Sequence, residues 1–481
     1  MNQRIKYYLL LLIIVLSVIL MILLPAAILL TMNDSLGGIT NDPSTGTTQA
    51  PVSGGTTAPA DPSDPATTPS TTPPTTAAPT EPPVVKVGTF TLSSVGDVLI
   101  HSNVYNAAKT GSGYDFSQNF RFLEDYITSA DYAAGNLETT LAGEDFVHGD
   151  GTVGYYGYPH FNCPDEIIDG MKDAGFDMIL TANNHSYDTR SVGFHRTMQT
   201  IADRGLAFLG TQADAEDPDY ILVERNGITL GLMCYTYEDD ADPDVKAPNG
   251  IPLNKADTPL MNTFNYQCLP EFYEEIEETM AEMESLGAEA TVLYIHWGYE
   301  YHLKQNSTQS KMAQALCDLG IDVIIGGHPH VVQPVELLTS TTDESHKTVC
   351  LYSMGNAVSN QRLGLISSID TAHTEDGLLF SVTFSKYSDG TVILESADAL
   401  PTWVFLGTSP ITGEWEYNIM PLDDSVSDWY AQLQLTDSMY KSCKASYDRT
   451  MAIVGSGMEE VDAYLAQNVA DTEALLGVTA P

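Results

Sequence analysis

The sequence predicts an α/β domain that follows an apolar N-terminal segment and a long polar linker. Short apolar runs alternate with amphipathic, helix-like segments along most of the chain, which is the pattern of βα units. Polar residues of the kinds that bind metals follow several of these apolar runs. With 481 residues, the chain is long enough to bury a sizeable core.

The first 31 residues are expected to form a membrane anchor. Residues 7–30 are an uncharged run of 24 residues, long enough to span the hydrocarbon core of a bilayer. Arg4 and Lys6 precede this run, and no basic residue follows it before Lys86. The positive-inside rule then predicts a single-pass protein of the cell membrane with a cytoplasmic N-terminus and an extracellular main domain. A cleaved signal peptide is the alternative.

Residues 32–85 are expected to form a disordered, Thr/Pro-rich linker. The segment consists largely of Thr, Pro, Ser, Gly and Ala and has almost no large apolar side chain. Such a composition cannot bury a core, so the segment is predicted to stay extended.

The main domain is predicted over residues 86–375. A strand is expected at 90–95, and after it four helix-like segments are each followed by an apolar strand-like run. The predicted helices cover 165–175, 194–205, 269–287 and 308–320, and the strands that follow them cover 176–182, 228–235, 290–295 and 321–326.

Residues 376–481 are expected to pack on the same domain. A hairpin is predicted over 378–400, because two apolar runs flank the turn residues Ser388-Asp389-Gly390. Two amphipathic helices are predicted near 424–435 and 457–470.

The six cysteines are predicted to be buried thiols. Their even number would permit disulfides. However, Cys234 and Cys350 lie in strand-like runs and Cys317 lies in a helix-like segment.

The charge excludes one class of partner. The chain has 64 acidic and 20 basic residues, for a formal net charge of −44. Nucleic acid is not expected as a partner, because phosphate binding needs a basic face. Divalent cations suit such a surface better, although the acidity could serve only solubility.

Residues able to hold metals or substrate follow the carboxyl ends of the predicted strands, where α/β folds build their sites. In chain order these residues are Asp97, His101, Asn136, Glu138, Asn184, His185, Asp188, His296, Glu300, His328, His330, Gln333 and Asn356.

Six of these side chains predict a binuclear metal site: Asp97, Glu138, Asn184, His296, His328 and His330. Carboxylate, imidazole and amide oxygen suit divalent ions, and two ions about 3.5–4 Å apart polarise an ester oxygen and activate water. In an extended segment, residues i and i+2 point the same way, so Pro329 is expected to aim both flanking imidazoles at one site, each toward one ion. Taken singly, each motif has an ordinary explanation as a turn, a helix cap or a core histidine. Their occurrence together at five strand ends favours the metal site.

Six motifs in a fixed order resemble the CapA family, named for a protein of poly-γ-glutamate capsule synthesis. They lie between residues 89 and 358 and are SVGDVLIH, GNLETTLAG, TANNHSYD, HWGYEY, GGHPHVVQPVE and YSMGN. The resemblance implies a calcineurin-like metallophosphoesterase fold, a four-layer αββα sandwich, and a cell-surface role in capsule or poly-γ-glutamate biosynthesis.

The resemblance also implies roles for individual residues. Asp97 corresponds to the first metal-binding aspartate, and Glu138 stands where a bridging aspartate would be. Asn184 corresponds to a metal ligand and His185 to a catalytic histidine that protonates the leaving group. His296, His328 and His330 match the remaining histidine ligands. The D-x-H motif of metallophosphoesterases is changed, because Leu99 replaces its histidine and the nearest histidine is His101.

The favoured hypothesis is a membrane-tethered, metal-dependent hydrolase or transferase that acts on an anionic wall polymer or ester. It would hold one or two ions of Mn, Fe or Zn, with His185 as general acid and Asp188 orienting it. Partners would include capsule synthase or export subunits. Substrate contacts are expected from Asn136, His101, Glu300, Gln333 and Asn356. The changed D-x-H motif favours the alternative of a non-catalytic accessory subunit, and a structural wall protein with a vestigial site is the third reading.

Overall fold

The computed structural model describes residues 83–238, 242, 245–367 and 369–478. The expected anchor over 1–31 and nearly all of the expected linker over 32–85 lie outside these residues. Within the described ranges, no helix combines the length and the apolar character needed to cross a membrane.

Two β-sheets form the centre of the mixed α/β fold. The first has the strand order β15-β14-β13-β1-β2-β3-β4, with β12 also paired to β1, and the second has the order β10-β11-β9-β8-β6-β5, with β7 paired to β6. The strands of the first sheet are β1 (Lys86–Val98), β2 (Tyr132–Leu137), β3 (Met178–Leu180), β4 (Ala207–Leu209), β12 (Asn356–Val358), β13 (Asp376–Tyr387), β14 (Val392–Thr408) and β15 (Trp415–Pro421). Those of the second are β5 (Tyr220–Arg225), β6 (Ile228–Glu238), β7 (Thr263–Asn265), β8 (Ala290–His296), β9 (Val323–Gly327), β10 (Val335–Thr339) and β11 (Lys347–Leu351).

Alternation of side chains places one apolar core between the sheets and another on each outer face. In β6, Leu230 and Leu232 belong to the core that also contains Phe90 and Leu92 of β1. The next residue, Met233, points to the other face and belongs to a separate core that includes residues of the helices on that side. A shift of one residue in register would exchange these faces, so the pattern fixes the pairing.

Helices cover the outer face of each sheet. Core residues of α5 (Glu166–Asp173) and α3 (Ser117–Phe120) pack on the first sheet, and those of α7 (Leu269–Ser285) and α8 (Ser307–Leu319) pack on the second. The remaining helices of the α/β region are α2 (Ser102–Ala107), α4 (Glu124–Thr128) and α6 (Arg190–Asp203). The predicted helices at 165–175, 269–287 and 308–320 agree with α5, α7 and α8 to within a few residues.

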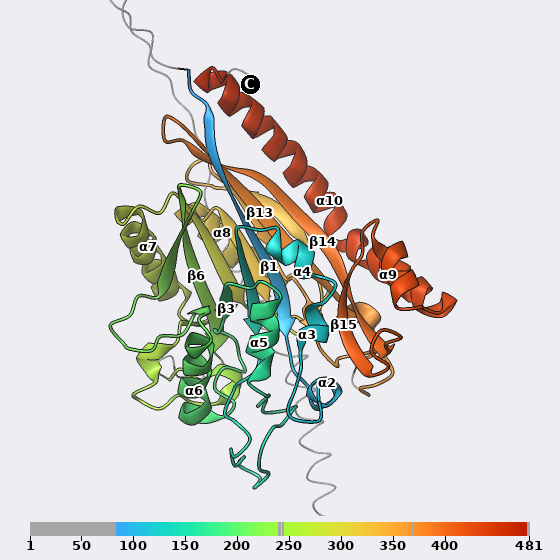
Figure 1. Cartoon of the computed structure of the whole chain (residues 1–481). Helices are drawn as coiled ribbons and strands as arrows, with labels where there is room; N and C mark the ends of the chain where they lie inside the picture. Colours follow the sequence, from blue (N-terminus) through green and yellow to red (C-terminus); the bar gives the residue numbers. More distant parts are fainter. Residues whose placement is uncertain (1–82, 239–241, 243–244, 368, 479–481) are drawn as a thin grey trace, which may run out of the picture. The chain divides into compact units, whose positions relative to one another are not determined.

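The segment after residue 376 extends the first sheet. Strands β13 and β14 form the predicted antiparallel hairpin, and β13 pairs with β1 from Lys86 to Val95. Helix α9 (Val426–Gln432) precedes α10 (Asp437–Leu476), which is far longer than the helix predicted near 457–470 and lies along β14 (Figure 1). Arg449 of α10 donates two hydrogen bonds, of 2.8 and 2.6 Å, to the buried Asp376 carboxylate of β13, which fastens this helix to the sheet.

All six cysteines are free thiols, as their placement in the sequence predicted.

The glycine before Asp97 shapes the end of β1. The predicted strand stopped at residue 95, which would leave Asp97 in a turn, but β1 continues to Val98. The pairing of β1 with β2 shifts between Val95 and Asp97, which marks a bulge at Gly96. A Cβ atom on Gly96 would lie 1.9 Å from the Gly355 carbonyl oxygen, so only glycine permits this close approach.

Replacing Gly96 by alanine is therefore expected to lower the free energy of unfolding by about 1–3 kcal/mol, because backbone must move to accept the methyl group. Urea denaturation measures this change. The matched control is Gly111→Ala, where the added methyl meets no atom within 4 Å, and a change within about 0.5 kcal/mol is expected there. Equal stabilities of the two variants would contradict the assignment of the bulge.

Candidate metal centre

The carboxyl ends of parallel strands from both sheets bring six predicted ligands together. We call these residues the candidate metal cluster: Asp97, Glu138, Asn184, His296, His328 and His330. Each is buried, with at most 4% of its surface exposed. The first three come from the ends of β1, β2 and β3, and the histidines come from the ends of β8 and β9.

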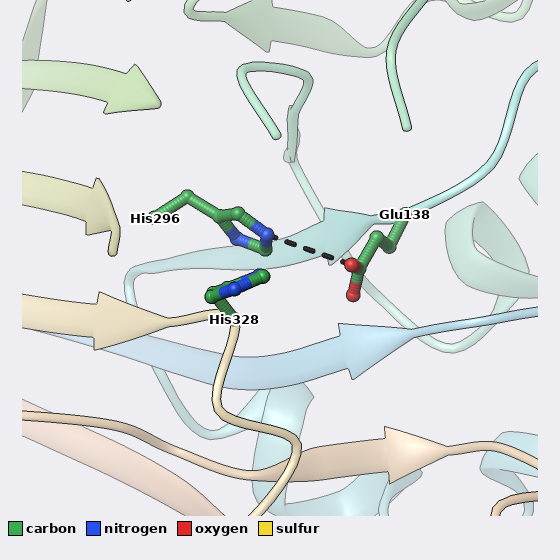
Figure 2. A group of neighbouring side chains, drawn as sticks. All are labelled: Glu138, His296 and His328. Carbon is green, nitrogen blue, oxygen red and sulfur yellow. Dashed lines mark ion pairs between the residues drawn. The ribbon is translucent and has the colours of Figure 1, made fainter. Parts of the chain in front are cut away.

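Glu138 lies at the centre of the cluster. Its carboxylate belongs to two groups of potential metal ligands, one with His296 and His328 and the other with Asp97 and His330. Within each group the ligand atoms lie within 4.8 Å of one another. Figure 2 shows the first group, in which Oε1 of Glu138 is 3.5 Å from Nε2 of His296. Glu138 is thus the ligand that the two groups have in common.

Asp97 and Asn184 complete the two sides. Asp97 Oδ2 accepts a hydrogen bond of 3.1 Å from His330 Nδ1, and its Oδ1 accepts one of 2.7 Å from the Asn136 amide. On the other side, His296 Nε2 donates to the Asn184 side-chain oxygen at 2.9 Å.

The backbone of the H-P-H segment differs from the prediction. His328 and His330 have φ angles of 93° and 56°, in the left-handed region, so the expectation of an extended segment is wrong. Left-handed backbone is unfavourable for residues other than glycine and persists where the surroundings enforce it. Both imidazoles nevertheless reach the cluster, and each joins a different ligand group, as predicted.

The buried charges shift the proton equilibria of the cluster. Burial alone would lower the pKa of His330, but the Glu138 charge and the Asp97 hydrogen bond outweigh it and raise that pKa to about 10. Burial would raise the pKa of Asp97, yet His330 and His296 hold it below its usual value. Burial and the neighbouring His296 lower the pKa of His328, so this imidazole is neutral and available as a ligand.

His185 and Asp188 form a pair beside the cluster. His185 Nδ1 donates a 2.8 Å hydrogen bond to Asp188 Oδ2, which also accepts one of 2.6 Å from the Phe161 backbone N–H. Burial would lower the pKa of His185, but the Asp188 charge and hydrogen bond raise it above its ordinary value. The arrangement fixes the ring and favours its protonated form.

Of the five residues expected to contact substrate, only two contact members of the candidate metal cluster in the described structure. Asn136 supports Asp97, and Asn356 accepts a 3.1 Å hydrogen bond from His330 Nδ1, so both contact the cluster directly. His101 is buried next to Phe161 and accepts from the Asn360 backbone N–H, and burial lowers its pKa to about 4. Glu300 lies exposed on the loop after β8.

Gln333 is engaged elsewhere. Its amide nitrogen donates to the His302 carbonyl oxygen at 2.7 Å, and its amide oxygen accepts from Gln309 at 3.1 Å. Gln333 has no exposed surface, and both of its polar side-chain atoms are hydrogen-bonded. It therefore connects its own loop to His302 and Gln309, and its amide is not available to a substrate.

Three positioning residues were missed by the sequence reasoning. Asn183 donates to the Asn136 side chain and accepts from the His185 backbone N–H. It therefore connects the residue that supports Asp97 to the loop that carries His185. Tyr237 at the end of β6 contacts His328 edge-on, with ring centres 4.8 Å apart. Phe161 contacts the rings of both His101 and His185. The strand-end rule could have found Tyr237, whereas Phe161 lies in an irregular segment with no such signal.

The side chains present fit divalent ions. Both oxygens of Glu138 and Nδ1 of His328 are buried without any hydrogen-bond partner. Burying a carboxylate without hydrogen bonds is unfavourable, and a coordinated cation would offset that cost. A Cβ atom on Gly327 would lie 3.3 Å from Asp97 Oδ1 and 3.4 Å from His296 Nδ1, so glycine keeps this part of the site open.

Comparison with known proteins identifies the family. Residues 91–361 match the family model described as bacterial capsule synthesis protein PGA_cap, and the chain belongs to this family. The resemblance to CapA is confirmed by two relatives. The capsule biosynthesis protein CapA of Bacillus anthracis is 25% identical over 335 residues, covering 68% of this chain and 71% of that protein. The PGA biosynthesis protein CapA of Bacillus subtilis (strain 168) is 28% identical over 272 residues, covering 56% of this chain and 63%, less than two thirds, of that protein.

Among solved structures, this chain is similar to the sulfate thiohydrolase SoxB of Thermus thermophilus. The alignment covers 69% of this chain and 45% of the SoxB chain. The sequence identity is 13% and the TM-score is 0.32. A likeness at this level supports no conclusion about activity.

Exchanging Glu138 for glutamine is expected to abolish stabilisation by metal, because both ligand groups lose their shared carboxylate. At a metal concentration 100 times its Kd, the wild-type protein should gain about 2.7 kcal/mol of stability. Thermal unfolding with Mn²⁺ or Zn²⁺, together with metal analysis of the purified protein, measures the effect. Glu414→Gln, the same change at an exposed turn, should respond like the wild type. An unaltered metal response of Glu138→Gln would contradict the bridging role.

Metal binding is expected to release protons and to strengthen as the pH rises. His330 is protonated in the metal-free protein at neutral pH because its pKa is about 10, and a metal binds only the unprotonated ring. The apparent affinity should therefore rise by up to about tenfold per pH unit over this range. Calorimetric titration in two buffers of different ionisation enthalpy counts the protons released. Identical heats in both buffers would contradict the prediction.

Proposed function

We propose that the protein is a membrane-anchored, extracellular participant in capsule or poly-γ-glutamate biosynthesis, with a calcineurin-like metallophosphoesterase fold and a metal-dependent hydrolase or transferase site. Family membership supports the biological role, and the composition of the candidate metal cluster supports the chemistry. The acidic chain, with 59 acidic and 18 basic residues from Lys86 onward, would repel an anionic wall polymer unless divalent ions bridge the two.

The observation that carries the catalytic proposal is the position of Glu138. One carboxylate, fully buried and without hydrogen bonds, is shared by two sets of ligand atoms. Hard and borderline ligands of this kind suit Mn, Fe or Zn. Divalent ions at such a centre supply Lewis acidity and lower the pKa of water.

The side chains beside the cluster provide the remaining functions. With Nδ1 bound to Asp188, the His185 ring can present Nε2 toward the substrate and donate a proton there to a leaving-group oxygen. Asp188 orients the ring and stabilises its protonated form. Asn136 and Asn356 hold the Asp97 and His330 side chains in place.

Replacing His185 by asparagine is expected to lower kcat by about 10²–10⁴-fold, the range typical of a lost general acid. Bound metal should be unchanged, because His185 belongs to neither ligand group. Turnover of bis(p-nitrophenyl) phosphate by the metal-loaded protein is the assay. A rate in His185→Asn equal to the wild-type rate would refute this role.

A non-catalytic accessory subunit of a capsule synthesis and export complex is the second candidate. It is favoured by Leu99, which replaces a histidine of the D-x-H motif, and by the engagement of His101 Nδ1 with the Asn360 backbone. Complementation of a capsule-deficient strain separates the two. Full capsule production by both Glu138→Gln and His185→Asn would favour the accessory role, and its loss in both would favour catalysis.

A further inference from the structure

A hollow of about 420 Å³ lies beside the first sheet, and no residue of the candidate metal cluster lines it. Its floor is the end of the β14–β15 pair, where Leu406 lies opposite Tyr417. Trp415 lies two residues before Tyr417 in β15, on the same side of the sheet. Helix α2 forms one wall with Asn103, Asn106 and Ala107, and Leu365 from the loop after β12 completes the lining.

The aromatic floor is both exposed and fixed in place. Trp415 exposes 54% of its surface, although a tryptophan of a folded protein is usually largely buried. Tyr417 below it is buried, and its hydroxyl donates a 2.6 Å hydrogen bond to the Asn360 side chain. The strand pairing therefore holds the exposed Trp415 ring in a fixed position at the surface, where a ligand can reach it.

The wall offers hydrogen-bonding groups that have no partner among the described residues. Asn103 and Asn106 are three residues apart on α2, so their side chains share one face of the helix. Both are exposed, and in the described part of the chain neither side-chain amide makes a hydrogen bond. Each amide can donate and accept at once.

The lining selects against charged ligands. None of the described residues that line the hollow carries a charge, and the chain as a whole has a formal net charge of −44. An anionic polymer would find no cation here and would be repelled over longer distances. A purely apolar segment would leave the asparagine amides without partners. A sugar ring combines an apolar face, which stacks on indole, with hydroxyl or acetamido groups that pair with amides.

From this combination we propose that the hollow binds a neutral glycan segment, one or two sugar rings long, stacked on Trp415 and hydrogen-bonded by Asn103 and Asn106. The hollow is connected to His101, because α2 begins directly after His101 and Asn360 binds both His101 and Tyr417. This binding goes beyond the proposed function and needs neither metal nor catalysis.

Titration of the full-length protein with the tetrasaccharide of N-acetylglucosamine tests the proposal. Trp415 is the one exposed tryptophan of the four, so its fluorescence should change saturably as the sugar binds. Trp415→Ala should weaken binding, measured by calorimetry, by about tenfold or more, as expected for a central aromatic contact. Trp415→Phe should retain most of the affinity, and the double variant Asn103→Ala/Asn106→Ala should weaken it. These exposed side chains can be replaced without loss of core packing.

Two controls isolate the hollow. Tyr447→Ala removes an aromatic residue of α10 that is 39% exposed and lies outside the lining, and it should bind the sugar like the wild type. Glu138→Gln should also bind normally, which separates this site from the metal cluster. The proposal is overturned if no saturation occurs up to about 10 mM sugar, if Trp415→Ala binds as well as the wild type, or if poly-γ-glutamate displaces the sugar.

Discussion

The buried carboxylate of Glu138 is the constraint on which the site depends. A charge of this kind is stable inside a protein only if opposite charge and hydrogen bonds surround it. Here both oxygens lack hydrogen bonds, and the nearest imidazole nitrogens are those of His296 at 3.5 Å and His330 at 3.8 Å. Burial of this carboxylate is unfavourable, and the protonated His330 and the surrounding core must offset that cost.

Both sheets contribute ligands to the candidate metal cluster. The carboxylates and the asparagine come from the first sheet, and the three histidines come from the second. The core of large apolar residues between the sheets keeps these two sets of ligands at a constant separation. Rigid strands below and short loops above give a geometry that free loops could not maintain.

The sequence predicted most of the elements and all six members of the cluster, because both follow from local patterns. Apolar runs such as that of β9 mark strands, and the carboxyl ends of parallel strands meet at one edge. The left-handed backbone of His328 and His330 was not predicted, because it is imposed by contacts such as the hydrogen bond from the Tyr301 N–H to the Pro329 carbonyl oxygen. The length of α10 was underestimated because its buried positions, from Cys443 to Leu465, face strands that are distant in the chain. The positions of Phe161 and Gln333 likewise depend on tertiary packing.

The pairing of β1 with β13 has a consequence for biogenesis. Val95, two residues before Asp97, is paired with Leu379 on one side and with Gly135 of β2 on the other, so the strand that carries the first ligand gains its second neighbour only after nearly three hundred further residues have been synthesised. Contacts this distant in the chain form late and slow the folding reaction. A polypeptide that ends before β13 would thus contain every ligand side chain and still leave one side of β1 unpaired, so the scaffold of the site is completed only once the later strands have been synthesised.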